Sequence, residues 1–407
     1  MVSPMPQGLI ERNENYHKSA KHDLLASSAS IISIADLLDI SENRTVSEEQ
    51  LALTKIILEE NEDNQGNIEL RTNLAALYSA RSAGVAPEDI VITNGAAAAN
   101  YTVFASLLAP GDHVIVQHPV DELLYKVPRL LGADVTLWEA NPSKRWRLDT
   151  DELRNLIKEN TSFIVIHSPC DPTGAIVPKP TLEILLKIAE EKGIVIVADE
   201  TYRPLFHSIL PSSEDFPPST INLGHQKVVV TGAVGKAYSL VGIKVGWIAS
   251  KDKEIIDACK RSRRYTSMTG SKLDEAVAAE ALSDRCIHAL LSRNIRLCQT
   301  NLELLQAFIE EHGWACSWVK PLAGTTAMIK FHKMGKPVDD NAFCLKLFEK
   351  AGLLVCPASK CFGESLQYRG YVRVAFGGST SQMKAALAAW SVFMEESYES
   401  VPAMSNT

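Results

Sequence analysis

The sequence predicts an α/β protein with a large part built on a mostly parallel sheet sandwiched by helices, and a smaller α+β part. Two observations lead to this fold class. Short apolar segments alternate with amphipathic helical segments between residues 51 and 290, as they do in βαβ units. After residue 290 one long helical pattern leads into fewer apolar segments. A chain of 407 residues is long enough to form two such parts.

The elements are expected in the following order. Residues 1–50 are polar and mixed, which indicates an N-terminal arm with a short helix near 31–40. In 51–290, apolar runs predict strands at 89–93, 113–117, 163–167, 194–198 and 228–232. Helical periodicity appears at 50–61, 69–84, 150–160 and 179–193. In 291–407, a long helix that begins near 287 should lead to strands at 327–332, 353–357 and 371–377.

Composition narrows the class of protein. A net charge of -8 argues against nucleic acid or an anionic membrane as the main partner. The eight cysteines form no CxxC pair, which favours reduced thiols in a cytoplasmic protein over disulfides or a metal site. Neither an apolar signal segment nor a membrane-spanning run is expected.

Lys236 stands where a predicted strand runs into small residues, in "TGAVGKAYSLVGIKVGW" (231–247). Ligands bind at such strand ends in α/β proteins. A phosphate-binding P-loop is excluded, because Val230 and Ala237 replace the first glycine and the final hydroxyl of that motif. A structural lysine with a packed stem remains possible, and so does a Schiff-base lysine with a lowered pKa.

Other segments carry candidate partners for this lysine. Asp199 directly follows a predicted strand and could serve the pyridine nitrogen of a cofactor, or merely cap a helix. Tyr202 follows it, and Asp171 lies in a proline-rich turn. Gly95 opens a helix whose free N–H groups could hold a phosphate. Arg373, inside an apolar strand, requires an anion such as a substrate carboxylate or a structural ion-pair partner.

In this order and spacing the segments resemble the fold-type I pyridoxal-phosphate enzymes, specifically the class I/II aminotransferases, over residues 50–390. The motifs that carry the resemblance are "HSPCDPTG", "ADETYRPL", "GKAYSLVGIKVGW" and "YVRVAFG". The segments "AKHDLLASSAS" and "AGLLVCPASKCFGE" also look similar to the branch that contains capreomycidine synthase. The spacing of Lys236 and Lys244 is similar to that in pyridoxal-phosphate-dependent arginine oxidases.

The resemblance implies that pyridoxal 5'-phosphate forms an internal aldimine with Lys236, which then moves the Cα proton of an L-amino acid. It implies that Asp199 pairs with the pyridine nitrogen and that Tyr202 hydrogen-bonds the phenolic oxygen. Arg373 would bind the substrate α-carboxylate. The phosphate would lie on the backbone of Gly95, Ala96 and Ala97. The family further implies a homodimer with active sites at the subunit interface.

Three acidic or basic positions depart from the family pattern. Asp171 replaces the usual asparagine near the phenolic oxygen and would touch both cofactor and substrate. Asp121 replaces an aromatic residue that stacks on the ring, and Lys244 replaces a phosphate-binding arginine with a point charge. The phosphate site also has fewer hydroxyl side chains than is usual in the family, because small residues stand at Ala96, Ala233 and Gly235. Either the cofactor binds more weakly with unchanged chemistry, or the pocket is adapted to a reaction other than plain amino-group exchange. We favour the second explanation, because the lysine, aspartate and arginine needed for the cofactor chemistry all remain.

Three functions are therefore compared. The first is an aminotransferase, and the second is a lyase, cyclase or replacement enzyme that uses the same quinonoid chemistry for elimination or cyclisation. The third is a non-catalytic regulator that keeps the fold. It is disfavoured, because the region before residue 50 is short and not basic enough for a DNA-binding domain.

Overall fold

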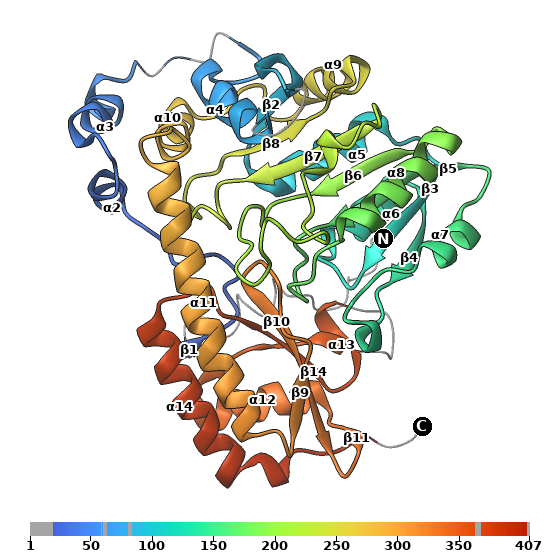
Figure 1. Cartoon of the computed structure of the whole chain (residues 1–407), viewed down its shortest axis with the longest axis vertical. Helices are drawn as coiled ribbons and strands as arrows, with labels where there is room; N and C mark the ends of the chain where they lie inside the picture. The colour runs from blue at the N-terminus through green and yellow to red at the C-terminus, as the bar shows by residue number, and fades with distance from the viewer. Residues whose placement is uncertain (1–18, 58, 60–62, 80–83, 363–367, 405–407) are drawn as a thin grey trace.

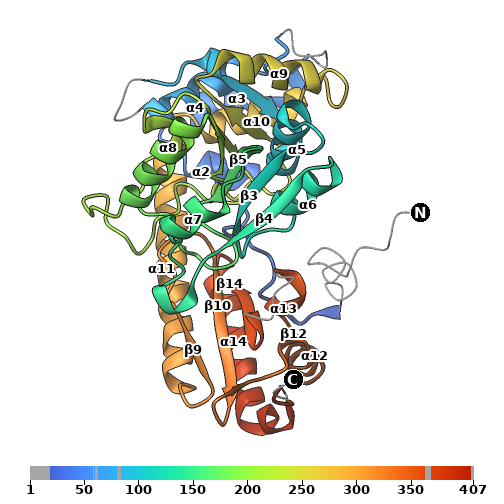
Figure 2. The same cartoon turned by 90° about the vertical axis from the view of Figure 1, so that its right-hand side faces the viewer.

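The computed structural model describes residues 19–57, 59, 63–79, 84–362 and 368–404. A seven-stranded sheet with its helices forms the upper part of the molecule, and a smaller sheet with its helices forms the lower part (Figures 1 and 2). The long helix α11 (Ile287–Glu311) runs from one to the other. The predicted α/β architecture is confirmed. The N-terminal arm is described only from residue 19 onward.

The large sheet has the strand order β2-β8-β7-β6-β5-β3-β4. Its strands are β2 (Ile90–Thr93), β3 (His113–His118), β4 (Asp134–Glu139), β5 (Thr161–His167), β6 (Val195–Asp199), β7 (Val228–Ala233) and β8 (Gly246–Ala249). All pairings are parallel except those of β8, which runs antiparallel to both of its neighbours. The carboxyl ends of β5, β6 and β7 consequently meet at one edge of the sheet.

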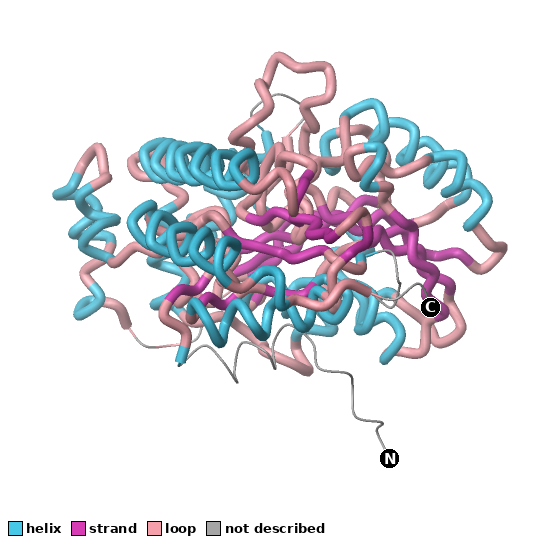
Figure 3. Tube along the Cα trace, turned by 90° about the horizontal axis from the view of Figure 1, so that it is seen from below, coloured by secondary structure: helices cyan, strands magenta, loops and turns pink. Residues whose placement is uncertain are grey.

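Helices cover both faces of this sheet (Figure 3). Successive side chains of a strand point to opposite faces, so Ile90 and Ile92 join one core cluster while Val91 joins the other. The first cluster includes residues of α4 (Ile68–Ser79), α7 (Thr150–Leu156), α8 (Lys179–Lys192) and α10 (Lys272–Ala281). The second includes residues of α5 (Gly95–Leu107), α6 (Leu123–Leu130) and α9 (Lys253–Arg263). Nearly continuous apolar strands therefore fit a sheet that is buried on both sides.

The smaller sheet is antiparallel and has a core of its own. Its strands are β9 (Cys316–Trp318), β10 (Thr326–Lys333), β11 (Lys336–Pro337), β13 (Cys356–Pro357) and β14 (Tyr371–Ala375). The helices packed with it are α12 (Asp340–Ala351), α13 (Ala358–Cys361) and α14 (Thr380–Glu396). The arm joins this part through β1 (His22–Asp23), which pairs with β12 (Leu353–Leu354). The arm then continues upward into α2 (Ile34–Asp39) and α3 (Arg44–Gln50).

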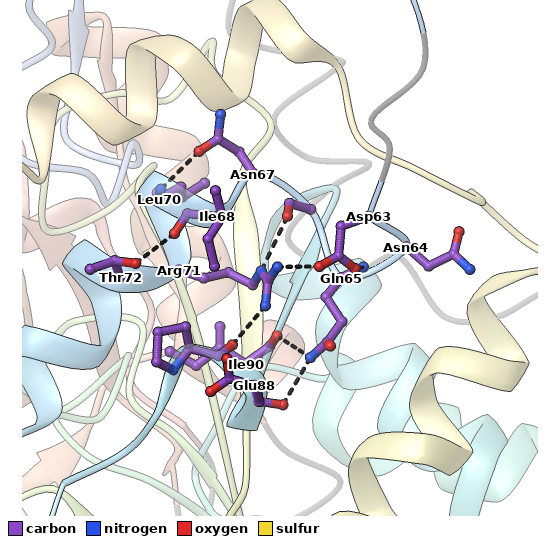
Figure 4. A network of polar contacts seen from close by, with 12 residues as sticks. Asp63, Asn64, Gln65, Asn67, Ile68, Leu70, Arg71, Thr72, Glu88 and Ile90 are labelled. Atoms are coloured by element: carbon purple, nitrogen blue, oxygen red, sulfur yellow. Dashed lines mark hydrogen bonds and ion pairs between the residues drawn. The ribbon is translucent and has the colours of Figure 1, made fainter.

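A buried polar network fixes the segment before α4 against β2 (Figure 4). Arg71 donates to the carbonyls of Gly66 and Pro87 and forms an ion pair with Asp63. The Gln65 side-chain amide donates to the backbone carbonyls of residues 88 and 90, and the backbone carbonyl of Gln65 accepts from the N–H of residue 92. These bonds hold β2, which leads directly into the first turn of α5.

Several strands and one helix differ from the sequence-based expectation. In the large sheet, β4 and β8 were not expected: β4 carries charged residues at both ends, and β8 follows a glycine-rich segment that interrupts the apolar pattern. Outside this sheet, the short strands β1, β9 and β11 were not expected either. The helix predicted at 50–61 was wrong in its described part, which holds only a 3-10 turn at Leu53–Lys55. Ile57 is 70% exposed, so apolar spacing there finds no surface to pack against. Residues 58 and 60–62 lie outside the described residues.

Among the described residues no helix is both long enough and apolar enough to cross a lipid bilayer. All eight cysteines lie among the described residues, where they are buried and form no disulfide. The predicted division at residue 290 falls inside α11, so a single helix runs through that position.

Candidate active site

The parallel strands bring polar side chains to one edge of the large sheet. In the register of β5, β6 and β7, His167 pairs with Asp199 and Asp199 pairs with Thr231. Lys236 follows β7 by three residues, as predicted from the end of its apolar run. The carboxyl edge of a parallel sheet is the usual ligand site of α/β proteins.

A cavity of about 210 Å³ opens at this edge. The residues predicted for the site that line it are Ala96, Ala97, Asp121, Asp171, Asp199, Tyr202 and Lys236. The further lining residues are Ser27, Asn100, Leu123, Leu124, His167 and Thr201. Most of the predicted residues, which are far apart in the sequence, therefore face one space.

Lys236 presents its amine to the cavity rather than to bulk solvent. The Nζ atom donates to Ser27 Oγ at 2.5 Å, and the Lys236 carbonyl accepts from Ala29 N at 3.0 Å. Burial lowers the pKa of the Lys236 ammonium; Asp171 opposes this shift and Arg373 adds to it. A lowered pKa increases the fraction of neutral amine, the form that attacks a carbonyl group.

Asp199 is a buried carboxylate that is held from both sides. One oxygen accepts from Asn100 Nδ2 at 2.7 Å, and the other accepts from Thr201 N at 2.9 Å and from the Thr201 hydroxyl. Thr231 in turn donates to Asn100 Oδ1 at 2.8 Å. A turn follows Asp199 rather than a helix, so the helix-cap interpretation does not apply. These donors fix the orientation of the Asp199 carboxylate, which lines the cavity.

Asp171 lies between Tyr202 and Arg373. The Tyr202 hydroxyl donates to Asp171 Oδ2 at 3.0 Å. Arg373 Nε donates to Oδ1 at 3.1 Å and Nη2 donates to Oδ2 at 2.8 Å, which makes a bidentate ion pair. Burial alone would raise the pKa of Asp171, but the charge and hydrogen bonds of Arg373 lower it to about 2. Burial and the nearby Asp171 charge raise the pKa of Tyr202.

Arg373 is fully buried and is not among the residues that line the cavity. Its Nη1 donates to the carbonyl of Leu25, and its other two nitrogens hold Asp171. The sequence left open whether this arginine meets a substrate carboxylate or a structural partner. In this arrangement the partner is an internal carboxylate.

The first turn of α5 provides the backbone groups for a phosphate. Gly95 has φ +84°, and a Cβ built on it would meet nothing within 4 Å. Asn94 makes no side-chain cap of this helix. Ala96 and Ala97 open onto the cavity, so α5 offers free N–H groups and the positive end of its dipole. Gly95 itself lies at the start of the helix, next to these lining residues.

Lys244 does not reach the cavity. Its side chain is exposed, Nζ donates to the carbonyl of Val241 at 3.2 Å, and its backbone N–H donates to Asp274 at 3.2 Å. The predicted contact of Lys244 with the cofactor has no support in this geometry. Asp121 does line the cavity, where it also accepts from Leu123 N at 2.9 Å at the start of α6. Burial raises the pKa of Asp121.

Four polar wall residues were missed from the sequence. Asn100 lies one turn after Ala96 in the apolar helix "GAAAANY", and its polarity there was a usable signal. His167 ends the apolar run "FIVIH", so the strand-end argument would also have found it. Thr201 follows Asp199 by two residues. Ser27 comes from the N-terminal arm and had no local signal.

The residues present fit pyridoxal phosphate. One cavity holds an amine for its aldehyde, an anchored carboxylate for its pyridine nitrogen and a helix N-terminus for its phosphate. The match is weakest at the phosphate, where backbone groups are present but Lys244 is turned away. The chemistry of these donors is otherwise the one expected from the motifs.

Comparison with known proteins gives the same assignment. The family described as "Aminotransferase class I and II" matches residues 42–389. An aspartate aminotransferase of Thermotoga maritima is 27% identical over 336 residues, which cover 80% of this chain and 81% of the relative. Capreomycidine synthase of Streptomyces vinaceus is 28% identical over 301 residues, 74% of this chain and 73% of that protein.

A solved structure extends the similarity to the three-dimensional level. The crystal structure of a PLP-dependent aminotransferase from Streptococcus suis superposes with a TM-score of 0.86 at 31% identity, covering 97% of this chain and 98% of that one. The aspartate aminotransferase structure from Thermotoga maritima, at 23% identity and a TM-score of 0.79, shares the fold. The chain therefore belongs to the aminotransferase class I and II family and is a fold-type I, pyridoxal-phosphate-dependent, aminotransferase-like enzyme.

Proposed function

We propose that this enzyme transfers the amino group of an L-amino acid, with pyridoxal phosphate attached to Lys236. The observation that carries the proposal is the convergence of the Lys236 amine, the anchored Asp199 carboxylate and the first turn of α5 on one cavity. A structural lysine would not need a buried carboxylate and a helix N-terminus as neighbours.

Bound pyridoxal phosphate supplies an electron-withdrawing ring that makes the Cα proton of an attached amino acid acidic. Lys236 takes this proton and returns it, because burial favours its neutral, basic form. Ser27 Oγ accepts a hydrogen bond from Nζ and so directs the amine within the cavity. Asn100 and Thr201 fix the Asp199 carboxylate, which would pair with the protonated ring nitrogen.

Tyr202 and Asp171 would lie beside the phenolic oxygen. To donate to that oxygen, the Tyr202 hydroxyl would give up its hydrogen bond to Asp171. The raised pKa of Tyr202 keeps its hydroxyl protonated. Ala96 and Ala97 would bind phosphate through the backbone of α5.

A lyase, cyclase or replacement reaction is the second candidate. Two wall residues favour it: Asp121 and Asp171 add carboxylates where the family usually has an aromatic ring and an amide. Asp121, whose pKa is raised by burial, could accept and return a proton at a side-chain carbon, whereas Asp171 stays paired with Arg373. The similarity to capreomycidine synthase agrees with this candidate.

We further infer a homodimer in the cytoplasm. An apolar cavity of about 520 Å³ with exposed Ile31, Ile34 and Val241 lies between the arm and the loop after Lys236. Burial of this surface by a second copy would suit the family's mode of assembly. Eight buried cysteines that form no disulfide in the described structure agree with a reducing compartment.

The test is a screen of purified, yellow enzyme against the common L-amino acids, one at a time. Transamination predicts that the yellow absorbance falls while one equivalent of the matching keto acid appears, and that an added keto acid restores it. Elimination or cyclisation predicts a different product. In that case the yellow absorbance returns without any added keto acid. A protein that binds the cofactor but shows neither change with any amino acid would refute both reactions. Lys236→Ala serves as the inactive control.

A further inference from the structure

The guanidinium of Arg373 is already occupied by a carboxylate. Nε and Nη2 hold both oxygens of Asp171 at 3.1 and 2.8 Å, and Nη1 donates to the carbonyl of Leu25. Arg373 is 0% exposed, whereas Asp171 lines the cavity. Asp171 is therefore the group that a ligand in the cavity meets, and Arg373 lies behind it.

Building on the proposed function, we propose that Asp171 determines substrate specificity by competing with the substrate carboxylate for Arg373. A ligand carboxylate that reaches Arg373 makes one bidentate ion pair but breaks another of the same kind. The displaced Asp171 is then a carboxylate without its cation in a buried site, which is strongly unfavourable. The net contribution of the ligand carboxylate to affinity is consequently small.

The groups around Asp171 do not replace its lost partner. Tyr202 donates one hydrogen bond from its hydroxyl, and His167 and Asp121 lie on the same cavity wall. Asp121 is a second acid, whose charge adds to that of Asp171. Lys236 is the one lysine or arginine among the described lining residues. Attachment of the cofactor would make its ammonium group unavailable as a partner for Asp171.

A ligand with a second positive charge offsets the loss. Its carboxylate can take Arg373 while its cation takes Asp171, so one ion pair is exchanged for two and no charge is left unpaired. The cavity should therefore favour L-amino acids with a cationic side chain over neutral ones of the same shape. The Asp171–Arg373 pair thus gives a rule for the class of substrate.

Three small ligands separate these contributions. L-Norleucine and 1-aminopentane differ only in the carboxylate, and L-lysine adds an ammonium group to L-norleucine. Dissociation constants are measured from the change in cofactor absorbance, independently of turnover, for the yellow wild-type enzyme, Asp171→Asn and Asp121→Asn. The asparagine at 171 keeps the size of the side chain and an oxygen for Arg373. Asp121→Asn removes one wall carboxylate that does not contact Arg373.

We expect wild-type enzyme to bind L-norleucine within about tenfold of 1-aminopentane, and to prefer L-lysine to L-norleucine. In Asp171→Asn the ratio of 1-aminopentane to L-norleucine dissociation constants should rise about tenfold or more, and the preference for L-lysine should fall by a similar factor. Asp121→Asn should move the first ratio by less than about threefold.

Two results would overturn the proposal. In the first, folded and yellow Asp171→Asn binds all three ligands in the wild-type ratios, which leaves the amino-acid reaction intact but removes the competition. In the second, wild-type enzyme already favours L-norleucine over 1-aminopentane by more than about a hundredfold, as an open Arg373 would. If only these three ligands leave the absorbance unchanged while other L-amino acids shift it, the inference alone fails. If no L-amino acid shifts the absorbance while the cofactor is bound, the proposed function fails and this inference with it.

Discussion

Gly246 in β8 approaches the first residue of α5 so closely that it has no room for a side chain. A Cβ built on Gly246 would lie 2.4 Å from the Gly95 carbonyl carbon, 2.7 Å from its oxygen and 2.8 Å from its Cα. All three atoms are backbone, so no flexible side chain can turn away. Gly246→Ala must therefore push the start of α5 away from the sheet.

The size of the effect follows from these distances. Ordinary contacts begin near 3.4 Å, so the two backbones must separate by about 1 Å. Overpacking of this kind costs about 1–3 kcal/mol of unfolding free energy. A displacement of about 1 Å would also weaken the hydrogen bonds that we propose between the first turn of α5 and the cofactor phosphate. Losing one charge-assisted bond costs about 1.5–3 kcal/mol, or roughly 10- to 150-fold in the cofactor dissociation constant.

The assay is a titration of cofactor-free protein with pyridoxal phosphate, followed by absorbance, together with a thermal melt. Gly313→Ala is the matched control, because a Cβ there would make only ordinary contacts, at 3.5 and 3.6 Å, and its φ lies outside the left-handed region. Gly313→Ala should bind the cofactor like wild type. A Gly246→Ala protein with a lowered melting temperature but wild-type cofactor affinity would refute the assignment of α5 as the phosphate site.

Three further outcomes are expected. Asp199→Asn should lower kcat about a hundredfold or more, since the ring nitrogen would lose its anionic partner. Steady-state kinetics with the best substrate from the screen measures this loss. A variant with wild-type kcat would exclude Asp199 from the site. The folded-state pKa of Asp171, about 2 against 3.8 when unpaired, adds about 2 kcal/mol to stability above pH 4 or 5 through its pair with Arg373. About half of this stabilisation should be lost by pH 3. Urea unfolding should show the loss in the wild-type protein but not in Asp171→Asn. Equal acid sensitivity of the two proteins would contradict the pairing. Ser27→Ala removes the hydrogen-bond acceptor of Lys236 and should reduce kcat/KM up to about tenfold. An unchanged kcat/KM would show that Ser27 does not direct the amine.

The residues at strand ends could be predicted from the sequence because the rule that places them is local. Lys236 and Asp199 each follow an apolar run, and a parallel sheet brings such ends together whatever the loops do. His167 obeys the same rule and was overlooked. The motif around Tyr202 added the cavity wall beyond Asp199.

Contacts between distant segments could not be read in the same way. Asp171 and Arg373 are 202 residues apart. Asp171 lies in the turn after β5 and Arg373 in β14 of the smaller sheet, so nothing local indicates that they pair. Ser27 reaches Lys236 across 209 residues from the arm. Lys244 was placed by its spacing from Lys236, but the turn after Val241 directs its side chain outward.

The account depends on the covalent attachment of pyridoxal phosphate to one amine. Reduction of the yellow enzyme with sodium borohydride, followed by proteolysis and mass spectrometry of the peptides, identifies the attached residue directly. We predict a single modified peptide that carries the cofactor on Lys236, and no modified peptide from Lys236→Ala. Attachment to another lysine, such as Lys244, or a fully reduced protein with no modified lysine, would contradict the account.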